Sequence, residues 1–237
     1  MHSLIYEAVQ HEGFPVSDGY RRLVEHFFDD DFALLLAAYR SANLRMMSDA
    51  GALIVRFSKH AETELEGGEI IAAIGAEAPD GIGAAIVAHG LDEQRHHRMF
   101  KAMAERVADD FGIEHFPLKY RDPAPTIRNL SGTDAWKYLI VSIHWAEVRN
   151  LFILDNYLEA LGRVDWRCTP LLIKQIKAVQ ADEIRHVGYT AKYIADIIAD
   201  PAFVDIAHEY KQSYLANCWK EIGEMAHYFA THERIDG

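Results

Sequence analysis

The chain has only two cysteines, Cys168 and Cys218, among its 237 residues. This scarcity excludes a disulfide framework, and the absence of a Cys-x-x-Cys pair excludes the usual sulfur ligands of zinc or of a rubredoxin-type iron. Basic runs are also missing, and the formal net charge is -12. Because binding to nucleic acid requires clustered lysine and arginine, nucleic acid is not an expected partner.

Long apolar runs are absent as well. Uncharged apolar stretches such as residues 151–154 are far too short to cross a bilayer, and the first residues lack the basic and apolar blocks of a signal peptide. We therefore expect no membrane partner and a cytoplasmic location. Half of the residues are apolar, so residues 1–237 are expected to form a single domain with a sizeable core.

Helical periodicity dominates the chain, and no strand signal of useful length occurs. Apolar stripes at helical spacing predict four core helices, over about residues 50–75, 82–111, 133–161 and 170–199. A turn at residues 78–81 separates the first two helices, and Gly112 is a plausible stop for the second. Polar residues at 131–134 offer helix caps for the third, and Pro170 opens the fourth.

The segment between the second and third core helices is predicted to be a crossover. Three prolines, Pro117, Pro123 and Pro125, argue against a helix over residues 113–130. Amphipathic segments at about 20–47 and 203–229 are expected to pack outside the core helices. The predicted fold is therefore all-α: a four-helix bundle with one long crossover and flanking N- and C-terminal helices.

One motif occurs twice, ninety residues apart: Asp92-Glu93-Gln94-Arg95-His96 and Asp182-Glu183-Ile184-Arg185-His186. On a helix, a Glu and a His three positions apart share a face, so each copy can present one carboxylate and one imidazole to a metal ion. A single pair of this kind is usually a coincidence on a surface. Two matched copies on apolar stripes predict two metals.

A two-metal site needs further carboxylates from the other two helices. Glu147 is the one acid on the apolar stripe of the third helix, 36 residues before Glu183, and an unpaired buried carboxylate is costly without a cation. On the first helix we favour Glu64, which shares a face with apolar residues and precedes Glu93 by 29 residues. Glu62 is the alternative on that helix.

The predicted metal ligands, which are also the candidate catalytic groups, are Glu64, Glu93, His96, Glu147, Glu183 and His186. Oxygen and nitrogen ligands without sulfur suit iron or manganese better than zinc or copper. The flanking residues Asp92, Arg95, Asp182 and Arg185 are expected to hold the ligating histidines through hydrogen bonds and ion pairs across the bundle. Ordinary surface ion pairs are the alternative for these four residues.

The paired motif resembles that of the O₂-activating di-iron carboxylate proteins of the ferritin-like superfamily, which include monooxygenase hydroxylases, the ribonucleotide reductase small subunit and acyl-carrier-protein desaturases. The resemblance covers roughly residues 53–197. It implies that Glu93 and Glu183 are bridging or flexible ligands. Glu64 and Glu147 would then be terminal ligands, with one histidine for each iron. The implied cofactor is two iron ions, with manganese or a mixed pair as the alternative.

The chain departs from three branches of that superfamily. It lacks the Cys-rich iron domain of rubrerythrins. The N-oxygenase branch has a histidine one turn before its last Glu ligand, where this chain has Val179. Storage ferritins are shorter and usually lack two full copies of the Arg-containing motif.

The function implied by the resemblance is that of a non-haem di-iron oxygenase or oxidase, with O₂ and a small, largely apolar organic compound as substrates. A ferredoxin or reductase is the implied electron donor. Two alternatives remain: a ferroxidase or peroxidase of the ferritin or rubrerythrin type, and a metal-stabilised scaffold or partner subunit without activity. The oligomeric state is open, a homodimer being one option.

Several other residues lie near the predicted ligands in the helical pattern. His60, His89 and His144 fall on or near core faces, and we expect hydrogen-bonded core residues rather than ligands. Tyr189 and Tyr193 are expected to pack in the core, with radical chemistry as the alternative.

Two adjacent glycines, Gly67 and Gly68, are unusual inside a helix, where each costs about 1 kcal/mol relative to alanine. Close helix packing explains them. The alternative is that they leave room for O₂ and substrate beside Glu64.

Overall fold

The computed structural model describes residues 2–11, 13–27, 30–114 and 132–231. Within these ranges the regular elements are all helices: α1 (His2–His11), α2 (Asp18–Phe27), α3 (Asp30–Met47), α4 (Ala50–Glu77), α5 (Ile82–Phe111), α6 (Ala135–Leu161), α7 (Thr169–Ile197) and α8 (Pro201–Thr231). The all-α prediction is therefore confirmed. Among the described helices, none combines the length and the apolar character that crossing a membrane requires.

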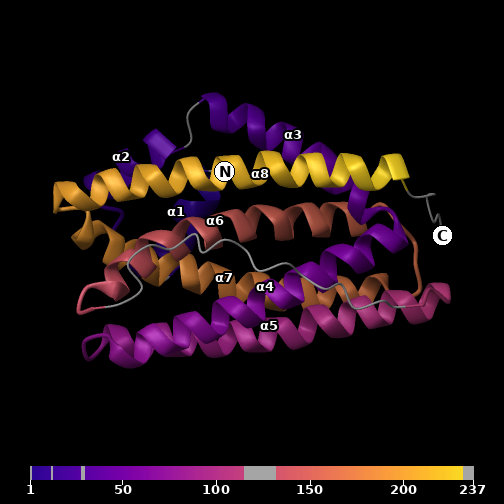
Figure 1. Cartoon of the computed structure of the whole chain (residues 1–237), viewed down its shortest axis with the longest axis horizontal. Helices are drawn as coiled ribbons and strands as arrows, with labels where there is room; N and C mark the ends of the chain where they lie inside the picture. Colours follow the sequence, from indigo (N-terminus) through magenta and orange to yellow (C-terminus); the bar gives the residue numbers. More distant parts are fainter. Residues whose placement is uncertain (1, 12, 28–29, 115–131, 232–237) are drawn as a thin grey trace.

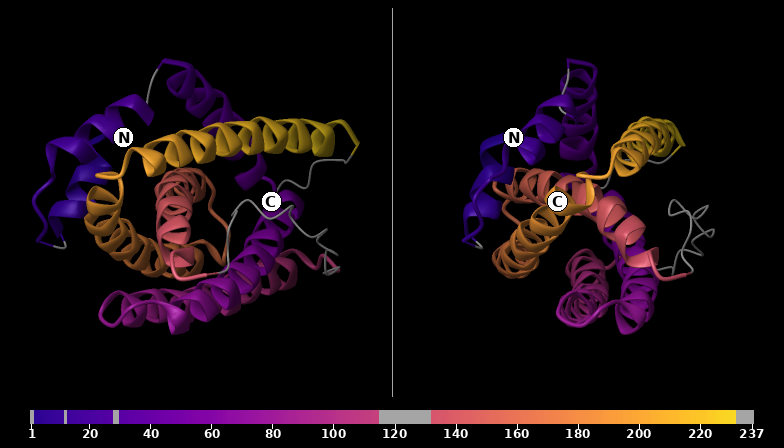
Figure 2. Two further views of the ribbon diagram at one scale, coloured as in Figure 1. Left: turned by 60° about the vertical axis from the view of Figure 1, so that its left-hand side comes forward. Right: turned by 90° about the vertical axis from the view of Figure 1, so that its left-hand side faces the viewer.

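Four long helices, α4 to α7, surround a common interior (Figure 1). α4 packs along α5, and α6 packs along α7. Contacts between α5 and α7 and between α4 and α6 join the two pairs. The remaining helices lie outside, because α1 and α2 pack on α7 whereas α3 and α8 pack on α6, as the further views in Figure 2 show.

Local signals in the sequence explain where the bundle helices begin and end. The Asp49 side chain accepts a hydrogen bond of 2.7 Å from the Ala52 backbone N–H and so caps the start of α4. Gly81 lies between α4 and α5 with a φ of 91°, and Gly112 ends α5 with a φ of 62°. Only glycine adopts such conformations at little cost. Pro170 lies in the first turn of α7, where its missing N–H has no helical partner to lose.

The N-terminal part differs from the prediction. The segment expected at about residues 20–47 is two helices, α2 and α3, and α1 precedes them without having been predicted. α1 is short, yet Ile5, Ala8 and Val9 lie on one face and are buried against the bundle. A tertiary contact of this kind stabilises a helix that is too short to be recognised from periodicity alone.

The start of α6 also differs. Side-chain capping was expected from residues 131–134, but the Asp134 carboxylate makes no capping hydrogen bond and pairs instead with Lys137 at 2.8 Å. The predicted crossover at residues 113–130 falls, apart from its first two residues, outside the described part of the chain.

Glycines bring α4 and α5 close together. A Cβ atom added to Gly68 would lie 2.8 Å from the Gly90 carbonyl oxygen and 2.9 Å from Glu93 Cβ. A Cβ atom on Gly90 would likewise lie 2.7 Å from the Gly68 carbonyl oxygen, whereas one on Gly67 would meet no atom within 4 Å. Gly68 thus serves close helix packing, and the idea that it leaves room for O₂ and substrate is wrong.

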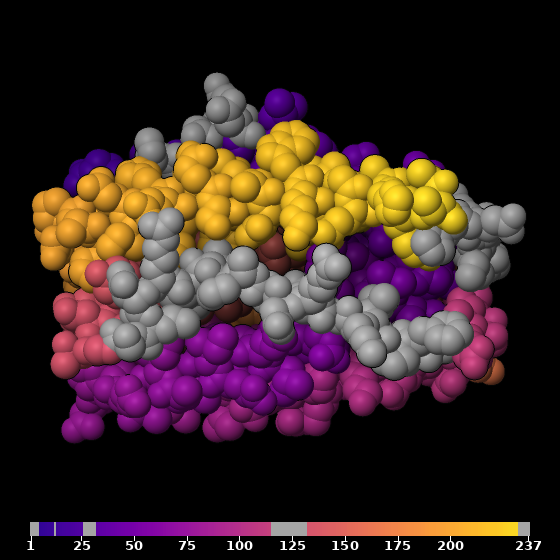
Figure 3. Space-filling view, in the orientation of Figure 1, coloured from indigo at the N-terminus to yellow at the C-terminus, as the bar shows by residue number. Residues whose placement is uncertain are grey.

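A largely buried group of charges attaches α8 to the bundle, and Figure 3 shows α8 lying along one side of the molecule. The Glu221 carboxylate on α8 accepts a hydrogen bond from Tyr39 and lies 3.7 Å from Arg56, 3.7 Å from Lys59 and 3.5 Å from Arg149. Burial opposes ionisation, but the surrounding cations hold the pKa of Glu221 well below its ordinary value of 4.5. Glu221 is therefore charged in the folded protein.

Replacing Glu221 with Gln is expected to lower the free energy of unfolding by about 3 kcal/mol, because Arg56 and Arg149 lose the charge that compensates their burial. Denaturant unfolding at neutral pH measures this loss. The matched control is Glu224→Gln on the same helix, whose side chain is 50% exposed against 13% for Glu221. The Glu224 variant should lose less than about 1 kcal/mol of unfolding free energy.

Since the pKa of Glu221 is lowered on folding, the contribution of Glu221 to the free energy of unfolding is complete above pH 4.5 and declines as acid is added. Equal costs for the two variants would contradict this account.

The close approach of α4 and α5 at Gly68 can be tested with a matched pair of variants. Gly68→Ala is expected to destabilise the protein by about 1–3 kcal/mol, because the new methyl group must push α5 away from α4. Gly67→Ala meets open space and is expected to be neutral or to stabilise by about 0.5–1 kcal/mol. Thermal and denaturant unfolding of both variants would measure the difference, and similar stabilities would rule out the close approach.

Candidate metal centre

All six predicted ligands are buried between α4, α5, α6 and α7. The relative exposure of these residues is at most 7%, and the group comprises Glu64, Glu93, His96, Glu147, Glu183 and His186. Every bundle helix supplies at least one carboxylate. Glu62, the alternative to Glu64, is only half-buried and lies outside the groups of potential ligands found among the described residues.

Two carboxylates lie between the two motif histidines. His96 Nδ1 is 3.6 Å from Glu93 Oε2 and 3.4 Å from Glu183 Oε1. His186 Nδ1 is 3.3 Å from Glu93 Oε1 and 3.0 Å from Glu183 Oε2. Each carboxylate therefore directs one oxygen towards each histidine, which is the arrangement that a ligand bridging two metals requires.

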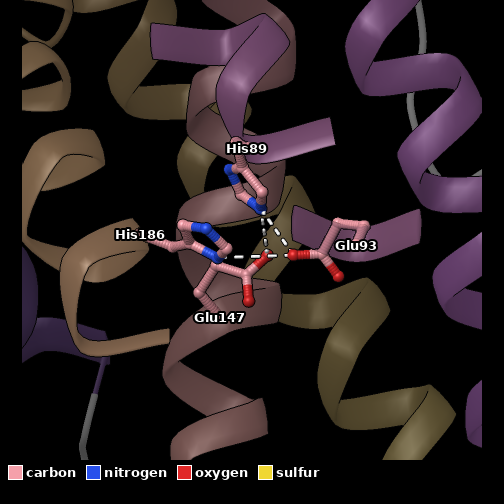
Figure 4. Close-up of side chains that lie close together, drawn as sticks. All are labelled: His89, Glu93, Glu147 and His186. Carbon is pink, nitrogen blue, oxygen red and sulfur yellow. Dashed lines mark ion pairs between the residues drawn. The ribbon is translucent and has the colours of Figure 1, made fainter. Parts of the chain in front are cut away.

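A third histidine, His89, joins this cluster (Figure 4). Its Nε2 atom lies 3.1 Å from Glu93 Oε1 and 3.2 Å from Glu147 Oε1. Its ring stacks on that of His186, with centroids 3.7 Å apart and planes inclined by 19°. The sequence predicts a hydrogen-bonded core residue, and His89 is buried and contacts the Tyr189 hydroxyl, but it also lies within a group of potential ligands. The signal in the sequence was its position one turn before Glu93, on the same helix face.

The other two core histidines stay outside the cluster. Thr190 donates to the His186 carbonyl oxygen, so its hydroxyl accepts from His144 Nδ1 at 2.8 Å. His144 Nε2 then accepts from Tyr20 at 2.8 Å, and burial lowers the pKa of His144 to about 3. His60 packs between the rings of Phe100 and Tyr157. Both are core residues, as expected.

Each motif histidine is held by the aspartate of the other motif. His96 Nε2 lies 3.1 Å from Asp182 Oδ2, and His186 Nε2 lies 3.3 Å from Asp92 Oδ2. An ionised carboxylate only accepts hydrogen bonds, so each Nε2 carries a hydrogen. The lone pair of each imidazole is then on Nδ1, which faces the buried glutamates. Partners of this kind orient the histidine ligands of metals.

Two arginines on the outer surface complete this network. Arg95 pairs with Asp92 at 2.8 Å and with Asp182, and Arg185 pairs with Asp92 at 3.3 Å and with Asp182. The hydrogen bond from His186, with added attraction from both arginines, lowers the pKa of Asp92 to about 2. Asp92 thus stays ionised, and the two aspartates together keep both imidazoles in one orientation.

Without metal, the four glutamates repel one another strongly. Burial, followed by repulsion from Glu93, raises the pKa of Glu64 well above its ordinary value. Burial and the charges of Glu147 and Glu93 likewise raise the pKa of Glu183. Burial also opposes ionisation of Glu93, but the proximity of Glu64 and of the His89 and His96 imidazoles lowers its pKa. The metal-free site therefore retains protons that bound cations would displace.

Several atoms in the centre have no hydrogen-bond partner among the described residues, although buried polar atoms are normally satisfied. They are His89 Nε2, Glu93 Oε1, His96 Nδ1 and Glu183 Oε1. His89, Glu93 and His96 belong to two groups of potential ligands that share Glu93, one with Glu147 and His186 and the other with Glu64. Within each group the potential ligand atoms lie within 4.8 Å of one another, whereas Glu183 is in neither group. Oxygen and nitrogen donors without sulfur fit a pair of iron or manganese ions.

The described pocket between α3, α6 and α8 is separate from this centre. Trp145, Val148, Arg149 and Phe152 line it from α6, and its volume is about 20 Å³. Along a helix these residues face away from Glu147. A space of this size holds roughly one water molecule.

Replacing Asp182 or Asp92 with Asn should weaken metal binding by about 10–100-fold, because a neutral amide oxygen accepts more weakly from the histidine Nε2–H than a carboxylate does. Competition with a chelator of known affinity measures the change. Asp155→Asn is the control. Asp155 also links two bundle helices, because its carboxylate accepts a hydrogen bond of 2.6 Å from Gln180, but it contacts no histidine of the centre. Unchanged affinity in Asp182→Asn would show that this residue forms only a surface ion pair.

Comparison with protein-family models, with curated proteins and with solved structures finds no match to the chain.

Proposed function

We propose that the chain is a non-haem di-iron oxygenase or oxidase built on a ferritin-like bundle of α4 to α7. Its substrates would be O₂ and a small, largely apolar organic compound. A ferredoxin or reductase would supply electrons. The bundle arrangement, with carboxylates from all four helices and Glu-x-x-His pairs on two of them, supports the ferritin-like assignment.

One observation carries the proposal: two carboxylates, Glu93 and Glu183, each direct one oxygen towards His96 and the other towards His186. A structural ion pair needs only one contact between a carboxylate oxygen and an imidazole, and it does not require that the two oxygens face different histidines. Four buried glutamates would also be costly to keep together unless cations offset their charge. A two-metal site explains both features.

The six predicted ligands and His89 would hold the two ions. When bound, two ferrous ions supply the electrons and open coordination positions needed to reduce O₂. The protein's own contribution is geometric and electrostatic. The aspartate–arginine network keeps the imidazoles oriented, and apolar residues such as Ile86 and Val187 lie in the fully buried core of the bundle helices.

The experiment starts from metal-free protein loaded anaerobically with ⁵⁷Fe(II). We expect about two irons per chain by metal analysis, and a ferrous Mössbauer signal that is lost rapidly on exposure to O₂. Glu147→Ala should retain less iron, whereas Glu224→Ala, which alters a half-exposed carboxylate on α8, should load normally. Less than about one transition-metal ion per chain would overturn the proposal.

The same preparation distinguishes the proposed activity from storage. An oxygenase is expected to consume O₂ repeatedly when an electron donor and an organic substrate are present. A ferroxidase would consume O₂ only in proportion to added Fe(II). If iron binds but does not react with O₂, the result would favour the alternative of a metal-stabilised scaffold without activity.

A further inference from the structure

The two metal positions of the centre have unequal sets of donor atoms. Three imidazoles serve two positions, so one position must take two of them. Interatomic distances place most donor atoms on one side or the other, and Glu64 is placed by its grouping with Glu93 and His96. This inference rests on the proposed metal pair and concerns how that pair is formed.

One side, the two-histidine position, collects atoms of five residues: Glu93 Oε1, Glu147 Oε1, Glu183 Oε2, His89 Nε2 and His186 Nδ1. Glu147 Oε2 points elsewhere, because it accepts a hydrogen bond of 3.3 Å from Asn150. Five donors, two of them nitrogen, therefore face this position.

The other side, the one-histidine position, collects fewer donors. They are Glu93 Oε2, Glu183 Oε1, His96 Nδ1 and the carboxylate of Glu64. No second imidazole reaches this side among the described residues, because His60, which precedes Glu64 by one turn, packs against Phe100 and Tyr157 instead.

A second observation favours His89 as a ligand over a simple hydrogen-bonding residue. Its Nδ1 atom lies 2.8 Å from the Tyr189 hydroxyl, so both of its nitrogen atoms are positioned by named groups. The same holds for His96 and His186, each of which has one nitrogen at the glutamates and the other on an aspartate. A histidine that binds metal through one nitrogen is normally fixed in this way through the other.

We infer that His89 is a metal ligand, and that the two-histidine position binds a divalent transition metal first and more tightly than the one-histidine position. Imidazole raises affinity for first-row transition metals from iron to zinc, whereas carboxylate-rich sites suit manganese and magnesium. The centre would therefore fill in order. It would also accept two different metals, the more nitrogen-seeking ion entering beside His89.

The test is an anaerobic titration of metal-free protein with Co(II). Calorimetry and the visible absorption of the bound ion measure binding at each addition. The unaltered protein is expected to show two steps whose dissociation constants differ by at least about tenfold. His89→Ala should weaken the first step by at least about tenfold and make the two steps similar. His60→Ala is the matched control, since it also removes a buried imidazole one turn before a glutamate of the centre, and should leave both steps unchanged.

A second variant keeps the test informative if His89→Ala fails to fold. Tyr189→Phe removes only the hydroxyl that contacts His89 Nδ1 and should weaken the first step by about tenfold, with the second step unaffected. Two steps of equal affinity in the unaltered protein would overturn the inference while leaving the metal pair in place. An unchanged first step in the folded His89 variant would do the same. Absence of any Co(II) binding would overturn the proposed function as well.

Discussion

The mutual repulsion of four buried glutamates is the constraint on which this structure depends. Carboxylates in a low-dielectric interior repel one another strongly, and the protein offsets that repulsion with imidazoles and retained protons, in clusters that could hold a metal ion. The bundle must be stable enough to hold these groups together. Much of the remaining structure serves this purpose: apolar clusters lie above and below the charged layer, and α1, α3 and α8 cover the outside.

The aspartates and arginines of the two motifs connect that interior to the surface. Each aspartate supports the histidine of the opposite helix rather than that of its own, so α5 and α7 are joined by a reciprocal pair of hydrogen bonds. The arginines, about half-exposed, pair with both aspartates at the boundary with solvent. The orientation of the imidazoles is therefore set by two helices together, and neither copy of the motif is complete without the other.

Much of this arrangement follows from periodicity. Four long apolar stripes predicted the bundle helices to within a few residues, and the position of Glu147 on its stripe predicted an inward carboxylate. The sequence did not show which of three histidines on core faces would reach the glutamates, because His60, His89 and His144 share a pattern and differ only in tertiary neighbours. α1 was missed for a similar reason, since its burial on α7 depends on contacts between distant parts of the chain.

The glycine contact between α4 and α5 has a consequence for the geometry of the carboxylate cluster. Where backbone meets backbone, with Gly68 and Gly90 facing each other, no layer of side chains separates the two helices. The spacing between the backbones that carry Glu64 and Glu93 is therefore set by direct backbone contact rather than by side chains that could repack.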